Sequence, residues 1–377
     1  MRMRLCRITL GVGLVLAMAS SVMAQGAAAP AADDVTFNWM KRAIAYYPNS
    51  TFKLLENTSF ETPNGAYRIV RIERKCDSKL LSGEPSALVD EVTNSIWMGS
   101  IGELPFTGTG ASVDAIKNFV QDFLPEALQA NMNMRVRVEW DISPRKPGAL
   151  IPMSLMVRTG YGEYRRPAAV TADGRYLVMA AEASRDEDPV TARRRQLKSS
   201  DLVIWDSEHN GDASVEIVEF SDFECPACRS KWPLIKDVVE KNGSKARHGM
   251  VSFPLTMIHP WAFRSASATW CVGEQNPKSV IPLKELFYSL QREMEVSLVK
   301  PTTEDFVAGQ GLNDTAFSAC YLKQPSIEAV HRQIGLGQIM GVRATPTYYV
   351  NGWMVQVPNQ DWFPQLVADL AAGKDPM

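Results

Sequence analysis

The sequence predicts an α/β domain in its C-terminal part, preceded by a smaller α+β domain. From residue 214 onward, apolar runs and helical periodicity alternate in the order strand, helix, strand, several helices, two strands and helix. Before residue 184, segments of alternating polarity surround one long amphipathic segment, as in strands packed on a helix. Between these parts, residues 184–213 are charged and weakly patterned, which indicates a linker with a short helix near residues 190–197.

The N-terminal domain is predicted over residues 34–183. Residues 134–140 (MRVRVEW) and 175–182 (RYLVMAAE) alternate well enough for strands, and Asp173-Gly174 marks a hairpin turn before the second. Residues 112–130 (SVDAIKNFVQDFLPEALQA) have helical spacing, with Ser112 as the cap. We expect this domain to serve dimerisation or substrate binding.

The N-terminus has the features of a secretory signal peptide. Three arginines precede an apolar run of about fifteen residues, and the small residues Val22 and Ala24 precede the predicted cleavage site. A membrane span would need about twenty apolar residues. We therefore expect residues 1–24 to be removed near Ala24 and the chain to be exported to the periplasm.

Charge and length restrict the classes of partner. Without residues 1–24, 37 basic residues stand against 42 acidic ones, a net charge near −5. Nucleic acid and anionic membrane surfaces are therefore poor partners. About 350 mature residues suggest two domains, and an apolar content of 45% allows each its own core.

The C-terminal domain is predicted over residues 214–377. A buried strand (214–221) precedes a helix (226–243) that Gly243 ends and a second strand (248–255). A helical insert occupies about 257–341. Residues 345–357 are predicted as a strand, an Asn351-Gly352 turn and a strand, and residues 361–373 as a closing helix. This order is that of a thioredoxin fold with a helical insert.

Two cysteines, Cys225 and Cys228, stand where the first strand gives way to the helix. Unpaired N–H groups and the positive end of the helix dipole stabilise a thiolate at the first position. Cys225 is therefore the expected nucleophile and Cys228 the resolving thiol, with Pro226 at the first helical position. The pair is itself the redox group, and no separate cofactor is predicted.

Other roles for the pair fit the sequence less well. A structural zinc site needs four ligands, and neither His248 nor His259 is spaced to complete one, so no metal site is predicted. His259, which precedes a proline, is expected to cap or pack a helix. A purely structural disulfide would not need the change from strand to helix at this point.

The segment Thr345-Pro346 is the expected partner of the pair. A proline at the entry of a strand is confined to edges or special bonds, and in a thioredoxin fold the proline before the third core strand is cis. A cis bond there would turn the Thr345 carbonyl and N–H groups toward the cysteines, where they can pair with the backbone of a bound substrate chain.

Four motifs in this order resemble the DsbA-like thiol:disulfide oxidoreductases, in the branch with a helical insert: EFSDFECPAC, FPLTMIHPWAFRSASATWC, GLNDTAFSAC and GVRATPTYYVNG. The resemblance covers about 165 residues, from Ser214 to the C-terminus. It implies a redox pair at Cys225 and Cys228 and a substrate loop at Thr345 and Pro346. Glu219 matches the buried acidic position of that family, which serves proton transfer to and from the resolving thiol.

The sequence departs from that family in two ways. The residues between the cysteines are Pro-Ala, whereas the best-known oxidases have Pro-His, so thiolate stabilisation by that histidine is lost. Losing one such interaction would make the pair less oxidising, since about 30 mV corresponds to 1.4 kcal/mol. The long N-terminal domain is also absent from the plain oxidases, although isomerase relatives carry one.

Three cysteines remain in the mature chain. Cys271 and Cys320 lie in predicted helices of the insert, where a disulfide between them is favoured over two small buried apolar side chains. Cys76 is then the odd thiol. A buried free thiol is the favoured interpretation, and a link to a second copy of the chain or a target of the redox pair are the alternatives.

The sequence thus predicts a periplasmic oxidoreductase that exchanges disulfides with cysteine-containing exported proteins, with a membrane redox partner that resets the pair. One alternative is a disulfide isomerase or reductase, in which the N-terminal domain makes a homodimer. Another is a binding protein or chaperone for exported proteins with secondary redox activity, and a metal carrier is a more distant one. The direction of the reaction depends on reduction potential and partner.

Overall fold

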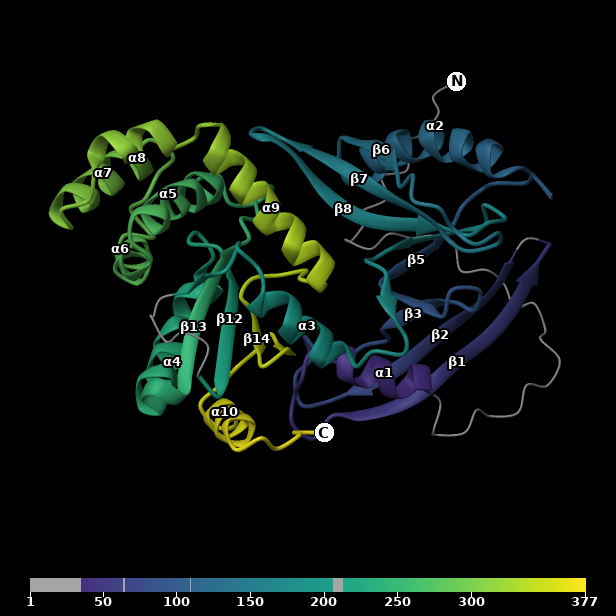
Figure 1. Cartoon of the computed structure of the whole chain (residues 1–377), viewed down its shortest axis with the longest axis horizontal. Coiled ribbons are helices and arrows are strands. Elements are labelled where there is room, and N and C mark those ends of the chain that lie inside the picture. Colours follow the sequence, from purple (N-terminus) through teal and green to yellow (C-terminus); the bar gives the residue numbers. More distant parts are fainter. Residues whose placement is uncertain (1–34, 64, 109, 206–212) are drawn as a thin grey trace, which may run out of the picture.

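The computed structural model describes residues 35–63, 65–108, 110–205 and 213–377. The predicted signal peptide, with its cleavage site near Ala24, lies outside the described residues. In the described part, the strands form three five-stranded sheets, two in the N-terminal region and one in the C-terminal region (Figure 1). No helix of that part is long and apolar enough to cross a membrane.

The first sheet is antiparallel and packs on the helix α1 (Val35–Ala43). Met40 and Ala43 of that helix share a buried apolar cluster with Val70 and Ile72 of the sheet. The cluster explains why this short helix forms, since burial of its apolar face stabilises it. The strands, in order across the sheet, are β1 (Thr51–Thr62), β2 (Gly65–Lys75), β3 (Ser86–Asp90), β4 (Ser95–Met98) and β10 (Ala183–Ser184).

The second sheet is also antiparallel and packs on α2 (Val113–Met132). Ser112 caps this helix as predicted, because its side chain accepts a hydrogen bond from the Ala115 N–H at 3.2 Å. Gly174, with φ +75°, lies in the predicted turn between two of the strands. In order, the strands are β5 (Ser100–Glu103), β9 (Tyr176–Met179), β8 (Gly162–Val170), β7 (Ile151–Thr159) and β6 (Val136–Trp140).

The two strands predicted in the N-terminal domain are confirmed as β6 and β9, and the predicted helix as α2. The α+β expectation understated the strand content, because two complete sheets accompany the two helices described there. The long β1–β2 hairpin is the main element that the pattern did not predict.

Residues 184–205 are packed rather than extended between the domains. They contain α3 (Pro189–Lys198), close to the short helix predicted, and β11 (Ile204–Trp205), which joins the third sheet. The Asp188 side chain caps α3 through the Thr191 N–H at 3.0 Å and forms an ion pair with Arg42 of α1 at 2.5 Å. The predicted linker therefore holds the two parts together up to Trp205.

The third sheet matches the predicted order of elements. β12 (Val215–Ser221) lies parallel to β13 (Ala246–Ser252) and antiparallel to β14 (Thr347–Val350), and all seven residues of β12 are buried. Burial along the whole length is typical of a strand covered on both faces, although β12 also carries Glu216 and Glu219. The remaining elements are β15 (Trp353–Val355), α4 (Pro226–Asn242), the short helix η1 (Gly243–Lys245) and α10 (Phe363–Ala371).

The helical insert lies near one end of this sheet (Figure 1). Cys271 and Cys320 form a disulfide that connects α5 to α8 across a sequence separation of 49 residues. A loop of this size closed by a disulfide stabilises a domain by about 2–4 kcal/mol. The insert comprises α5 (Ala262–Gln275), η2 (Pro277–Ser279), α6 (Val280–Ser289), α7 (Val299–Gly309), α8 (Asp314–Cys320) and α9 (Gln324–Met340).

The N-terminal region contacts the C-terminal domain at several places, among them the tip of the β7–β8 hairpin and the segment after α1. At the tip of the β7–β8 hairpin, the Tyr161 ring stacks on Phe263 of α5 with 4.2 Å between ring centroids. After α1, the Tyr46 N–H donates to the Met354 carbonyl of β15 at 2.6 Å. The N-terminal sheets therefore pack directly against the domain that carries the cysteine pair.

Candidate active site

Cys225 lies at the start of α4, where the turn after β12 meets the helix. Its N–H donates to the Asp222 carbonyl at 3.1 Å, and its φ of −72° and ψ of 117° are those of a capping residue. Pro226 occupies the first turn, where its missing N–H removes no helical hydrogen bond. The sulfur therefore lies beside the unpaired N–H groups of the helix and the positive end of its dipole.

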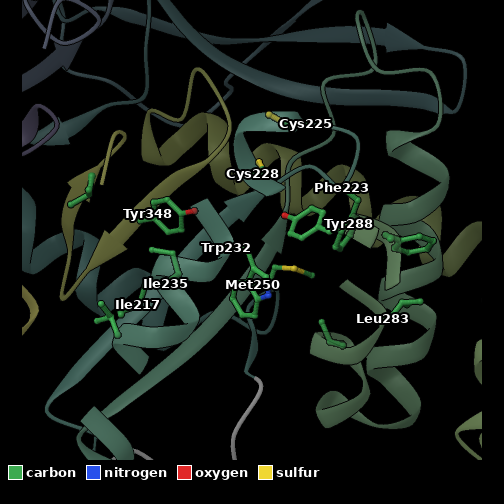
Figure 2. Close-up of a cluster of buried hydrophobic side chains, with 14 of the residues drawn as sticks. Ile217, Phe223, Cys225, Cys228, Trp232, Ile235, Met250, Leu283, Tyr288 and Tyr348 are labelled. Carbon is green, nitrogen blue, oxygen red and sulfur yellow. The ribbon is translucent and has the colours of Figure 1, made fainter. Parts of the chain in front are cut away.

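The two thiols differ in exposure and acidity. Cys225 is 6% exposed and Cys228 is fully buried, above a cluster that includes Phe223 and Trp232 (Figure 2). A hydrogen bond from Cys228, opposed by burial and assisted by backbone N–H groups of α4, lowers the pKa of Cys225 to about 6. Burial, together with negative charge at Cys225 and Glu219, raises the pKa of Cys228. At neutral pH the first sulfur is therefore the nucleophilic thiolate.

Thr345 and Pro346 face the pair from the segment before β14. The peptide bond between them is cis, and the Cys225 thiol donates to the Thr345 carbonyl at 3.4 Å. The Thr345 hydroxyl is buried and has no hydrogen-bond partner among the described residues. A polypeptide lying along this segment would meet the Thr345 main chain and hydroxyl within reach of the Cys225 sulfur.

Glu219 lies on β12 beneath the helix and is fully buried. Its Oε2 atom lies 2.5 Å from the Lys284 ammonium nitrogen and 3.2 Å from Nε2 of His248. Burial favours the neutral acid, but the charge of Lys284 and the contacts with His248 outweigh it and lower the pKa of Glu219 to about 2. The residue is therefore a permanent carboxylate near Cys228, whose ionisation it opposes.

Lys284 is a site residue that sequence reasoning missed. Its side chain is fully buried, and its ammonium nitrogen lies 3.8 Å from the centroid of the Trp232 ring, a cation–π contact. The signal was a single lysine on the apolar stripe of α6, which a helix buries together with Leu283 and Phe287. A buried lysine needs a carboxylate partner, although the spacing does not say which one.

His259 lies closer to the pair than its predicted capping or packing role suggests. Its Nδ1 atom is 2.7 Å from the buried Asp222 carboxylate, which also accepts the N–H groups of Leu255 and Glu224. The hydrogen bond to Asp222, opposed by burial and assisted by the charge of Cys225, raises the pKa of His259. His259 is thus protonated more readily than a free imidazole, and it lies within electrostatic range of the Cys225 thiolate.

A groove of about 910 Å³ opens beside Cys225. Glu224, Arg229, His259 and Gln291 contribute to its lining, and Gln291 donates to the Phe223 and Cys225 carbonyls at 2.6 and 3.1 Å. This hydrogen bonding fixes the turn that presents the sulfur.

The remaining thiol, Cys76, is far from this arrangement in the sequence and half-buried. It is free and donates weakly to the Ser78 carbonyl at 3.4 Å.

Within the ranges that the structure describes, no three His, Cys, Asp or Glu side chains are grouped as metal ligands would be.

Comparison with known proteins follows the same division of the chain. Residues 210–367 match the profile of the family described as Thioredoxin. A stretch of 161 residues is 29% identical to disulfide bond formation protein D of Bacillus subtilis, covering 38% of this chain and 67% of that protein. The C-terminal part of the chain is thus similar to the Thioredoxin family and to a disulfide bond formation protein. The β-rich region precedes the residues that match the Thioredoxin profile.

Other similarities fall on a similar share of the chain. A stretch of 141 residues is 26% identical to the Na(+)/H(+) antiporter NhaA 3 of Salinispora tropica, but spans only 21% of that protein. The catalytic domain of Proteus mirabilis ScsC is 18% identical, with a TM-score of 0.40 over 48% of this chain and 97% of that one. Oxidised BdbD from Bacillus subtilis is 24% identical, with a TM-score of 0.38 over 44% of this chain and 91% of that one.

Proposed function

We propose that this chain is a periplasmic enzyme that exchanges disulfides with exported proteins through Cys225 and Cys228. The main support is the unequal acidity of the two sulfurs: Cys225, the less deeply buried of the two, has a pKa of about 6, while burial raises the pKa of Cys228. A nucleophile that is ionised at neutral pH beside a protonated resolving thiol is what rapid disulfide exchange requires.

In the oxidising direction, a substrate thiolate attacks the Cys225 sulfur of the Cys225–Cys228 disulfide. The bond between the two cysteines breaks, Cys228 leaves with the electron pair, and a mixed disulfide forms between Cys225 and the substrate. A second substrate thiolate then attacks the substrate sulfur of that bond and releases Cys225 as a thiolate. Two electrons have passed to the enzyme, and the substrate has gained a disulfide.

Glu219 accounts for the fate of the leaving sulfur. Its carboxylate is kept ionised by Lys284, and its charge contributes to the raised pKa of Cys228. The Cys228 thiolate therefore takes up a proton from solvent water after it leaves, because Glu219, with a pKa of about 2, carries no proton to donate at neutral pH. A substrate segment aligned with Thr345 and Pro346 would present its cysteine to the Cys225 sulfur, since the Thr345 carbonyl lies 3.4 Å away.

The same steps run backwards in a reductase or isomerase. A membrane redox partner would reset the pair in either case, and the position of equilibrium follows from the reduction potential, for which about 30 mV corresponds to 1.4 kcal/mol. A potential near that of strong oxidants favours the oxidase. A potential near that of thioredoxin favours the isomerase or reductase alternative, with the β-rich region as its substrate-binding or dimerisation part.

The proposal is tested with single cysteine variants in an assay that follows oxidation of a dithiol peptide. Cys225→Ser should abolish turnover. Cys228→Ser, given a peptide that already contains a disulfide, should accumulate a mixed disulfide, because the Cys225 thiolate attacks the peptide disulfide, displaces one peptide thiolate and has no second thiol to resolve the product. Cys76→Ser is the matched control, because it removes another free thiol and should keep full activity. Turnover that survives Cys225→Ser would refute the proposal and favour a binding protein with incidental thiols.

A further inference from the structure

A second cavity, of about 690 Å³, lies between the N-terminal sheets and the C-terminal domain. Its walls come from α1, α3, the strands of both N-terminal sheets, the end of α9 and β15. Figure 1 shows the end of α9 beside α3 at the edge of those sheets. Four arginines are among the residues that line it: Arg74, Arg166, Arg193 and Arg343.

The positive charge in this cavity is not neutralised by the described carboxylates. Three glutamates also line it, but Glu84, Glu182 and Glu187 each pair with an arginine outside the lining, namely Arg71, Arg145 and Arg195. None of the four lining arginines forms an ion pair within the part of the chain that the structure describes. Grouped like charges cost free energy unless an anion joins them.

Two of these arginines are fixed and keep an unused donor. Arg74 is 7% exposed, and its guanidinium donates to the Ala45 and Leu81 carbonyls while its Nε–H has no partner among the described residues. Arg193 donates to the Ala43 carbonyl at 2.6 Å, and its buried Nη1 likewise lacks a described partner. Backbone anchoring of this kind pre-positions a guanidinium for a ligand.

The other two arginines come from different elements and lie close enough to repel each other. Arg166 belongs to β8, and Arg343 follows α9 with an accessible side chain. Burial and the charge of Arg166 lower the pKa of Arg343, as expected for two neighbouring guanidiniums. Planar guanidiniums in this arrangement suit a carboxylate, which accepts two parallel N–H bonds from each.

The position of the cavity connects it to the redox pair. Arg343 precedes Thr345 by two residues, and the Thr345 carbonyl lies 3.4 Å from the Cys225 sulfur. Two residues of extended chain span roughly 7 Å. A substrate strand aligned with Thr345 would therefore bring a side chain about two to four residues from its cysteine to the cavity.

We propose that this cavity binds acidic side chains of the polypeptide substrate close to its reacting cysteine, with Arg166 and Arg343 as the recognising pair. The inference rests on the proposed function and adds a substrate class to it. Methionines 98, 179, 340 and 354 also line the cavity, and their flexible side chains adapt to different neighbouring residues.

The test compares dithiol peptides that carry three glutamates or three glutamines on either side of the first cysteine. The wild-type chain should oxidise the glutamate peptide with a kcat/KM about 10-fold higher. The Arg166→Gln, Arg343→Gln double variant should lose that preference and keep its rate on the glutamine peptide. Arg165→Gln is the matched control, because Arg165 neighbours Arg166 but pairs with Glu139 outside the cavity and should keep the preference.

Binding of the same peptides with serine in place of cysteine separates this inference from the proposed function, because binding needs no redox chemistry. A preference for glutamate that the double variant abolishes would support the inference even if turnover fails. Equal binding of the two peptides by the wild-type chain would overturn it. A second result would also overturn it. If free N-acetylglutamate stabilised the wild-type chain but not the double variant, and the wild-type chain showed no preference between the peptides, the cavity would be a site for a small carboxylate.

Discussion

Replacing Lys284 by methionine tests the electrostatics beneath the cysteine pair. Lys284 and Glu219 are both fully buried, with 2.5 Å between the ammonium nitrogen and Oε2, and the pKa of Glu219 is lowered from 4.5 to about 2. At 1.36 kcal/mol per pKa unit, this difference corresponds to about 3 kcal/mol of stability at neutral pH. Removing one partner of a buried pair costs roughly 3–5 kcal/mol, because the other charge stays buried.

The stability of the Lys284→Met variant should change with pH in the direction opposite to that of the wild-type chain. In the wild-type chain the Glu219 pKa is depressed, so its contribution is present above pH 4.5 and is lost as the pH falls toward 2. In Lys284→Met, burial without the ammonium should raise the Glu219 pKa above its unfolded value. Stability from a raised pKa is lost as the pH rises through it, so the variant should gain stability when the pH falls from 8 to 5.

Urea unfolding of the full chain between pH 8 and 5 measures both effects. The matched control is Lys236→Met, which removes a surface lysine whose partner Glu285 is also partly exposed and should cost less than about 1 kcal/mol. A Lys284→Met variant within about 1 kcal/mol of the wild type at pH 7, or one whose stability runs parallel to the wild type over this range, would refute the reasoning.

Three further outcomes are expected. Thiolate absorbance should place the Cys225 titration near pH 6, and a midpoint close to the ordinary value of about 8.5 would contradict the stabilisation by α4. His259→Gln should raise that midpoint, because a nearby imidazolium is lost; an unchanged midpoint would exclude its contribution. Gly352→Ala should lower the melting temperature by several degrees, because φ is +89° and the new Cβ would lie 2.0 Å from the Val190 carbonyl oxygen. Gly335→Ala, which has open space around the new Cβ, should leave the melting temperature unchanged.

The C-terminal fold could be predicted because its pattern is unambiguous. The valine, isoleucine and phenylalanine residues of β12 indicate a buried strand despite its two glutamates, and Pro226 and Gly243 mark the ends of the helix after it. The N-terminal sheets were only partly predictable. In β1 no residue is fully buried, so its alternation between exposed and half-buried side chains carries little hydrophobic signal.

Some residues of the candidate site could also be predicted from the sequence, and others could not. Cys225 and Cys228 could be found because their chemistry depends on a local feature, the first turn of a helix. The partners of Glu219 could not, because a lysine from the insert and His248 from β13 reach it only through the tertiary fold. His259 was assigned a packing role because nothing in its sequence neighbourhood indicates the Asp222 carboxylate that holds it.

The local motif determines which sulfur reacts, whereas the distant residues determine how strongly the two sulfurs differ. The hydrogen bond from Cys228, assisted by backbone N–H groups of the first helical turn, lowers the pKa of Cys225, whereas burial and the charges of Cys225 and Glu219 raise the pKa of Cys228. The Glu219 charge persists in the interior because Lys284 and His248 offset the cost of burial. A substitution at Lys284 should therefore change the pKa of Cys228 without any contact between the two residues. A neutral Glu219 no longer opposes ionisation of Cys228, so the reduced thiolate forms more easily.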